Sequence, residues 1–316
     1  MDSTKRKFFF YLFYFTGIFF SYLIYGYFQE KITKTVYISN NARVKFEFPI
    51  SLVFCLCLSS FLTSLLSNFV IFGKFVVKSE IPIYYFVSCA LTYVCAMISS
   101  NASLKYVSYP AQVLAKSVKP ISVLFIGVLI GRKRYSIHKY IAVFILVLGI
   151  VLFFYKPDDS KTNSDSWPIF LLTVSLLFDG FTGGIQDRIK SFYKLEPLVL
   201  MLNMNFWSSI ALFLVILYTG EVWRFLEFLK LNPRVILQIC GAAVTSSIGQ
   251  LFIFGTIAHM GPLICSIYTT TRKFFTIVIS VIIFGNKLMV HQWISTCIVF
   301  AGLAYDSFFG KGIKHS

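Results

Sequence analysis

Long apolar segments are the feature of this sequence that most restricts its fold. Of its 316 residues, 57% are hydrophobic and only 13% are charged. A helix needs about 20 mainly apolar residues to cross a bilayer. The sequence contains ten such segments, near residues 8–28, 48–73, 83–104, 109–131, 138–155, 167–186, 197–218, 234–256, 262–285 and 290–309. Because a spanning backbone must satisfy its own hydrogen bonds, this pattern predicts an all-α polytopic membrane protein with ten transmembrane helices.

The second half of the chain repeats features of the first. A shift of 154 residues aligns three pairs: Lys119 with Lys273, Gly131 with Gly285, and Lys133 with Lys287. Five helices per half is an odd number, so the two halves would enter the membrane in opposite directions. The sequence therefore predicts two inverted five-helix repeats, residues 1–156 and 157–316. Transporters with this symmetry bind their substrate near the midplane between the repeats.

Four basic side chains lie near the middle of apolar segments: Lys116, Lys119, Arg272 and Lys273. A cation at the bilayer centre costs about 2.5–3.5 kcal/mol, so the four together cost on the order of 10 kcal/mol. Asp179 is the clearest carboxylate at similar depth, and it cannot neutralise all four. They either pair with Asp179 and with helix-end carbonyls, or they bind an anion. Arg offers a bidentate fork for phosphate and Lys a compact point charge, which favours a di- or triphosphate.

Polar residues near these cations extend the candidate substrate-binding set to Gln112, Gln250, Tyr268, Thr269 and Asn203. Their hydroxyl and amide groups suit phosphate, ribose or the edge of a base. The alternatives are structural: a threonine hydroxyl can bond to its own helix, and a buried amide can join two helices. Asn205 belongs to the same polar stretch as Asn203.

Two helix-modifying signals accompany the cations. Pro120 directly follows Lys119, and it lacks the backbone donor that the carbonyl of Lys116 would need, so the segment 109–131 is expected to bend. Gly180 and Gly184 form a Gly-x-x-x-Gly spacing, which predicts close helix packing next to Asp179.

Several function classes are disfavoured. The net charge of +16 is spread over short loops and forms no basic domain, so no nucleic-acid partner is expected. The seven cysteines all fall in apolar segments with no metal-ligand spacing, and no acidic metal-binding cluster is visible. We therefore expect no metal, no cofactor, no catalytic residue and no enzyme activity. The sequence sets no oligomeric state.

The distribution of Lys and Arg between loops predicts orientation. With ten helices both termini lie on one side, and that side carries 14 Lys and Arg residues against 11 on the other. Since cytosolic loops are enriched in these residues, both termini are predicted to be cytosolic.

Motifs along the chain resemble those of a known family. The stretches are Y-G-Y-F-Q-E-K-I-T (25–33), Y-P-A-Q-V-L-A-K-S-V-K-P-I (109–121), L-F-D-G-F-T-G-G-I-Q-D (177–187), L-M-L-N-M-N-F-W-S (200–208) and G-P-L-I-C-S-I-Y-T-T-T-R-K-F-F-T-I (261–277). Together they resemble the endoplasmic-reticulum branch of the nucleotide-sugar transporters, within the drug/metabolite transporter superfamily. The resemblance implies antiport across the endoplasmic-reticulum membrane. A cytosolic nucleotide (ATP/ADP) or UDP-sugar (UDP-galactose or UDP-glucose) would be exchanged for a lumenal nucleotide, with the four cations binding phosphate.

The location, the substrate and the function each have an alternative. The family often ends in a dilysine retrieval tail, whereas here Lys314 is third from the end, Ile313 holds the fourth position and the next lysine is Lys311. The Golgi membrane is therefore the alternative location. Four cations match the charge of a triphosphate, about −4, better than that of a UDP-sugar, about −2, which favours adenine nucleotides on charge. The alternative functions are a transporter of phosphorylated metabolites such as triose phosphate and, with less support, an intramembrane enzyme acting on polyprenyl phosphates.

Overall fold

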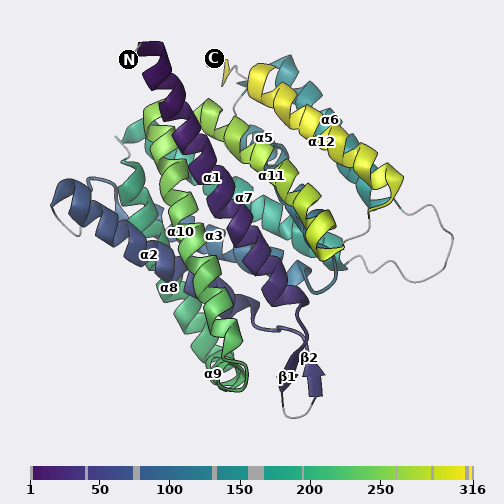
Figure 1. The fold of residues 1–316 in the computed structure, drawn as a ribbon. Coiled ribbons are helices and arrows are strands. Elements are labelled where there is room, and N and C mark those ends of the chain that lie inside the picture. Colours follow the sequence, from purple (N-terminus) through teal and green to yellow (C-terminus); the bar gives the residue numbers. More distant parts are fainter. Residues whose placement is uncertain are drawn as a thin grey trace. The chain divides into compact units, whose positions relative to one another are not determined.

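Helices make up almost all of the described structure, which is a computed structural model covering residues 3–39, 42–73, 79–129, 134–155, 167–193, 196–260, 262–285, 288–309 and 313–314 (Figure 1). The helices are α1 (Ser3–Lys34), α2 (Pro49–Phe72), α3 (Ile83–Ser103), α4 (Tyr109–Ser117), α5 (Lys119–Leu129), α6 (Ile137–Phe154), α7 (Trp167–Phe192), α8 (Pro197–Tyr218), α9 (Glu221–Leu231), α10 (Arg234–Met260), α11 (Pro262–Phe284) and α12 (Val290–Phe309). Two short antiparallel pairs accompany them, β1 (Tyr37–Ser39) with β2 (Ala42–Val44) and β3 (Arg134–Tyr135) with β4 (Ile313–Lys314). Gly131, Lys133, Lys287 and Lys311, which the sequence analysis used, lie outside the described residues.

Eight of the described helices are long and apolar enough to cross a membrane: α1, α2, α3, α6, α7, α8, α10 and α11. This confirms the predicted class, a helical polytopic membrane protein. The predicted number of ten spans does not follow from this criterion, because α4 and α5 are short and α12 is less apolar. The ten-helix inverted repeat therefore stays a prediction.

The segment 109–131 is not one bent helix, as expected, but two helices separated at Val118. Val118 has φ −85° and ψ 21°, and its N–H donates to the carbonyl of Ala115 at 3.2 Å. The physical reason is Pro120, which has no N–H to donate to the carbonyl of Lys116 and so cannot continue the α-helical ladder. The break therefore lies between the two lysines Lys116 and Lys119.

Helix α9 was missed by the sequence analysis, which expected only a connection between residues 218 and 234. Gly220, with φ +65°, ends the connection after α8, and α9 follows at Glu221. Its Phe225 and Phe228 are buried, as the i, i+3 spacing on one helical face allows. An 11-residue helix with charged residues on its other faces is too short and too polar to resemble a span.

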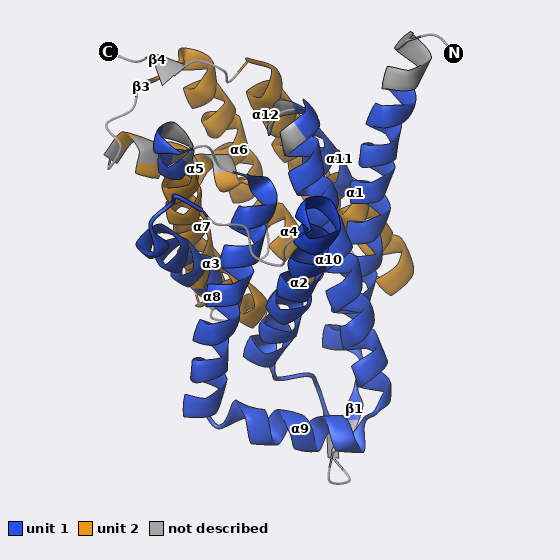
Figure 2. Ribbon diagram, turned by 90° about the vertical axis from the view of Figure 1, so that its left-hand side faces the viewer, with its two compact units in different colours: residues 1–94, 188–272 blue, residues 95–187, 273–316 orange. Residues whose placement is uncertain are grey.

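The chain forms two compact units, which Figure 2 colours blue and orange. Unit 1 consists of Met1–Val94 and Arg188–Arg272, and unit 2 of Cys95–Asp187 and Lys273–Ser316. The divisions fall inside α3, α7 and α11, so each unit takes helices from both predicted sequence halves. The division of the sequence into repeats 1–156 and 157–316 is a separate matter and stays a prediction.

Unit 1 has a core in which the β1–β2 pair and α9 cover the ends of α2 and α10. Phe46 and Phe228 make an edge-to-face contact with ring centroids 5.9 Å apart. Glu221 is buried, and its carboxylate accepts hydrogen bonds from the N–H and the hydroxyl of Ser51, at 2.9 and 2.8 Å. This carboxylate satisfies a donor of the first turn of α2 that no helical carbonyl can reach. Burial raises the pKa of Tyr37, whose hydroxyl donates to the carbonyl of Ile32 at 3.0 Å.

Unit 2 contains a tight contact between α6 and α12. A Cβ placed on Gly149 would lie 2.6 Å from a methyl group of Val299 and 3.2 Å from its backbone nitrogen. On the other helix, a Cβ on Gly302 would lie 3.0 Å from a methyl group of Ile145. Each glycine thus lets the facing helix approach closely.

We predict that Gly149→Leu destabilises the protein by about 1–3 kcal/mol, because the added side chain has no room against the Val299 backbone. Thermal unfolding of the detergent-purified protein measures the loss. Leu148→Val, on the exposed face of the same helix, is the matched control and should leave the unfolding temperature nearly unchanged. A Gly149→Leu variant as stable as the wild type would contradict the packing described.

Candidate functional site

Lys116 is held in unit 2 by two oxygen atoms of α7. Its ammonium forms an ion pair with the carboxylate of Asp179 and donates a hydrogen bond to the hydroxyl of Ser175 at 2.9 Å. Ser175 and Asp179 are four residues apart, so they lie one turn apart on the same face of α7. The side chains of Lys116 and Asp179 are only 22% and 14% exposed. The pairing with Asp179 that the sequence left open is therefore present for one of the four cations.

Ser175 extends this network to a third helix. Its hydroxyl is fully buried and donates to the carbonyl of Ala96 in α3 at 2.8 Å. Helix α7 also comes very close to α5, since a Cβ on Gly180 would lie 2.9 Å from the carbonyl oxygen of Ser122. The close packing predicted for Gly180 is confirmed. Gly184 has only an ordinary contact, at 3.7 Å from Ile126.

Lys273 binds the backbone at the break between α4 and α5. Its ammonium donates to the carbonyl of Lys116 at 3.3 Å. In an unbroken helix that carbonyl would accept from the N–H of residue 120, and Pro120 has none. The lysine of α11 thus supplies a donor where proline removed one, which is the helix-end bonding that the sequence analysis named as the alternative to anion binding.

Two further predicted residues belong to unit 2. Gln112 is buried, and its side-chain nitrogen donates to the carbonyl and hydroxyl oxygens of Ser100 in α3, at 2.8 and 3.0 Å. Lys119 begins α5 and is half-buried. Among the described residues it has neither an ion pair nor a hydrogen bond through its side chain. Unit 2 therefore joins Lys116 and Lys273 through a hydrogen bond, whereas Gln112, on the same helix α4, is bonded to α3.

Three predicted residues lie on α11 in unit 1. The guanidinium of Arg272 lies over the ring of Tyr22, 4.4 Å from its centroid, in a cation–π contact. The hydroxyl of Tyr268 donates to the carbonyl of Tyr11 at 3.2 Å. The hydroxyl of Thr269 donates to the carbonyl of Cys265, one turn earlier in its own helix, at 2.9 Å.

The two asparagines of α8 differ in what they contact. Asn203 donates to the carbonyl of Val199 in its own helix at 2.9 Å. The side chain of Asn205 is buried and donates to the side-chain oxygen of Gln250 in α10 at 3.4 Å. Gln250 is therefore joined to Asn205 and not to Asn203, which the sequence analysis had selected. Residues two apart on a helix face different directions, and the sequence could not decide which one faces α10.

Glu30 is a buried acidic residue that the sequence analysis missed. The first helix was expected to end near residue 28, but α1 continues to Lys34 and buries Glu30 to 1% exposure. Its carboxylate pairs with Lys34, one turn later, at 3.5 Å. The only sequence signal was its place in the stretch 25–33, which carries part of the family resemblance.

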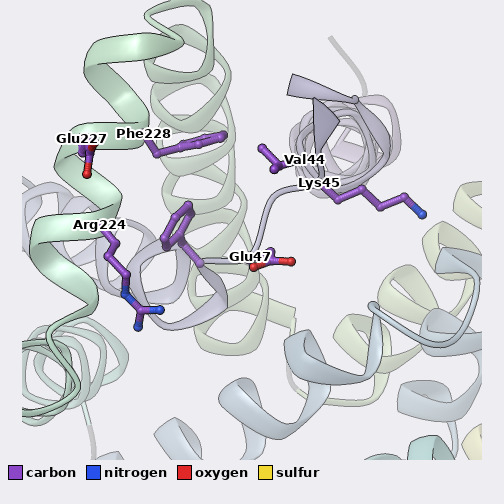
Figure 3. A pocket seen from close by; sticks show the side chains of 7 residues that line it. Val44, Lys45, Glu47, Arg224, Glu227 and Phe228 are labelled. Carbon is purple, nitrogen blue, oxygen red and sulfur yellow. The ribbon is translucent and has the colours of Figure 1, made fainter. Parts of the chain in front are cut away.

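A pocket of about 220 Å³ lies elsewhere in unit 1, between α9 and the segment that leads from β2 into α2. Figure 3 shows Arg224 and Glu227 on α9, with Lys45 and Glu47 on that segment. Phe48 and Phe228 contribute its aromatic surface. None of the predicted substrate-binding residues lines this pocket, and it is outside the membrane-spanning segments. Among the described residues, no group of three or more His, Cys, Asp or Glu side chains is placed to hold a metal ion.

These features define a class: a helical membrane protein whose apolar helices carry partly buried cations bonded to internal oxygens. Residues 10–309 match the model of the UAA transporter family. The chain belongs to that family, and it is therefore a transporter and not an enzyme.

Relatives match over nearly the whole chain. Solute carrier family 35 member B1 of Xenopus tropicalis is 42% identical over 305 residues, which is 95% of this chain and 94% of that protein. The protein of the same name from Gallus gallus is 43% identical over 303 residues, 95% of this chain and 93% of that protein. The homolog of that protein in Drosophila melanogaster is 38% identical over 312 residues, which is 94% of this chain and 90% of that protein. A solved crystal structure at 13% identity aligns over 93% of this chain and 96% of its own with a TM-score of 0.50, a likeness of fold alone.

The ion pair in unit 2 generates a stability prediction. Removing one partner of a shielded pair leaves the other charge uncompensated, so Lys116→Met and Asp179→Asn should each cost about 1–3 kcal/mol. The double variant should cost less than the sum of the two, by about 1–2 kcal/mol. Thermal unfolding of all four proteins in one detergent gives this coupling. Fully additive losses would mean that the two groups do not interact.

Proposed function

We propose that this transporter is an antiporter that exchanges a cytosolic nucleotide or UDP-sugar for a lumenal nucleotide across the endoplasmic-reticulum membrane. The proposed binding set comprises the four cations Lys116, Lys119, Arg272 and Lys273, together with Gln112, Gln250, Tyr268, Thr269 and Asn203. The observation that carries the proposal is the excess of cations over carboxylates in membrane segments. One carboxylate, Asp179, is bonded to one of the four cations.

The remaining cations argue for an anionic substrate. Lys119 has no internal counter-ion among the described residues. Keeping formal charges away from water is costly unless a counter-charge arrives. A phosphate-bearing substrate would supply it, and Arg272 adds the geometry suited to two phosphate oxygens. Membership of the UAA transporter family and the motif resemblance support nucleotides as the class.

The ten-helix arrangement supports alternating access. Helices α4 and α5 together cover residues 109–129, which is enough for one interrupted span, and α12 has 20 residues. With the eight longer helices they make ten. Within unit 1, α2 packs against α8, and within unit 2, α6 packs against α12. These are the second and fifth helices of each predicted repeat, paired with their counterparts.

The α6–α12 contact has the reciprocity that a repeat would produce. A shift of 154 residues takes Gly149 to position 303 and Val299 to position 145. The second close contact of this helix pair is that of Gly302 with Ile145, within one residue of the expected one. This agreement supports inverted halves, with both termini in the cytosol as the charge distribution indicates.

Charge does not by itself choose the substrate. The four cations matched a triphosphate of about −4, but the Lys116–Asp179 pair reduces their net charge to +3. A charge of +3 lies between those needed to neutralise a UDP-sugar, about −2, and ATP, about −4. Both therefore remain within the proposal, and the competition experiment below separates them.

We predict that Lys119→Ala and Arg272→Ala abolish nucleotide uptake into reconstituted vesicles while the proteins still fold. Neither side chain holds the Lys116–Asp179–Ser175 network, so the loss should be one of substrate binding. Lys45→Ala removes an exposed cation outside the spans and serves as the matched control, with uptake retained. Near-normal uptake by either site variant would refute the assignment.

The coupling mode gives another prediction. An empty site that holds several positive charges resists closure. The empty transporter should therefore reorient slowly from one side of the membrane to the other. Preloading vesicles with a nucleotide should therefore stimulate uptake several-fold. Uptake driven by a pH gradient and indifferent to preloading would argue against antiport.

In the same vesicles, ATP and ADP are tested as competitors of labelled UDP-galactose uptake. Failure of both to compete would leave a UDP-sugar as the substrate.

A further inference from the structure

The ammonium of Lys116 already binds the kind of atoms that a phosphate would present to it. The Asp179 carboxylate and the Ser175 hydroxyl approach it from one face of α7. Anionic oxygens at hydrogen-bonding distance are also what a lysine takes from a phosphate group. The ammonium has three donors, of which these oxygens use two, so a phosphate that takes more than one donor of Lys116 must displace an internal oxygen.

The two internal oxygens are not equally fixed. The Ser175 hydroxyl is tied to α3, because it also donates to the Ala96 carbonyl. The Asp179 carboxylate has Lys116 as its partner and no second hydrogen bond among the described residues. Asp179 can therefore lose Lys116 without breaking a further bond, whereas moving Ser175 would disturb the contact between two helices.

We propose that Asp179 is a specificity-determining residue that competes with substrate phosphate for Lys116. This inference rests on the proposed function, since it concerns the same site. A substrate that takes Lys116 leaves the carboxylate without its counter-ion in a shielded position, where charges interact strongly. The resulting repulsion grows with the charge of the bound anion. Asp179 thereby weakens binding of the most highly charged anions more than that of singly or doubly charged ones.

The test is the anion concentration that gives half-maximal thermal stabilisation of purified protein. Wild type and Asp179→Asn are compared with ATP, UDP-galactose and inorganic tripolyphosphate, which has the charge without a base. We expect the variant to need on the order of tenfold less ATP, with a clearly smaller gain for UDP-galactose. The ligand-free variant should unfold at a lower temperature than the wild type. Asp179→Ser is the second neutral variant if the asparagine protein does not fold.

Asp306→Asn is the matched control. Asp306 pairs with Lys139 between α12 and α6, with side chains 12% and 16% exposed, so this pair is as shielded as the first but contains no candidate site residue. The Asp306→Asn substitution should lower the unfolding temperature without changing the ATP concentration that gives half-maximal stabilisation. Adding Lys116→Met to Asp179→Asn should abolish the gain, because the competition is for that ammonium.

The outcomes separate the two proposals. Equal effects of Asp179→Asn and Asp306→Asn, or weaker ATP binding by Asp179→Asn, would overturn the inference while leaving the proposed function intact. If no nucleotide stabilises the wild type but Asp179→Asn still gains affinity for tripolyphosphate, the competition stands and the nucleotide assignment fails. If neither protein responds to any of the three anions, both proposals fail.

Discussion

The hydrocarbon core of a bilayer offers no hydrogen bonds, and the inner arrangement of unit 2 depends on this constraint. Every polar atom in a span must find its partner within the protein. Pro120 removes one backbone donor, and the carbonyl of Lys116 accepts from Lys273 instead. The side chain of Lys116 needs oxygen in turn and finds it on α7. The backbone and the side chain of Lys116 thus connect α4 to α11 and to α7.

Under the proposed function, the same bonds explain how charges at membrane depth can serve transport without unfolding the empty protein. A cation with no partner would destabilise a span, whereas one held by a carbonyl or a carboxylate is tolerated until a stronger ligand arrives. Lys116 and Lys273 are in this position. Under that proposal, phosphate oxygens replace the internal oxygens at the lysines, and this exchange couples substrate binding to the break between α4 and α5.

Sequence patterns predicted the membrane class and most helix positions because hydropathy and helix length are local properties. The predicted ranges 48–73, 83–104, 197–218 and 290–309 agree closely with α2, α3, α8 and α12. Predictions from local patterns failed where packing against distant segments determines the helices. Helix α9 is stabilised by burying Phe225 and Phe228 against distant strands and helices, and the continuation of α1 past residue 28 depends on contacts that shelter Glu30.

By itself the sequence determined that the protein spans a membrane, that cations lie inside apolar segments, and that a proline disturbs the segment carrying Lys116. It also named the possible partners of those cations without choosing among them. Only the tertiary structure decided that Asp179 pairs with Lys116, that Lys273 binds the open carbonyl, and that Asn205 reaches Gln250. The reason is that these partners are 63, 157 and 45 residues apart in the chain. Helical periodicity fixes the face on which a side chain lies, whereas packing between helices fixes what it meets.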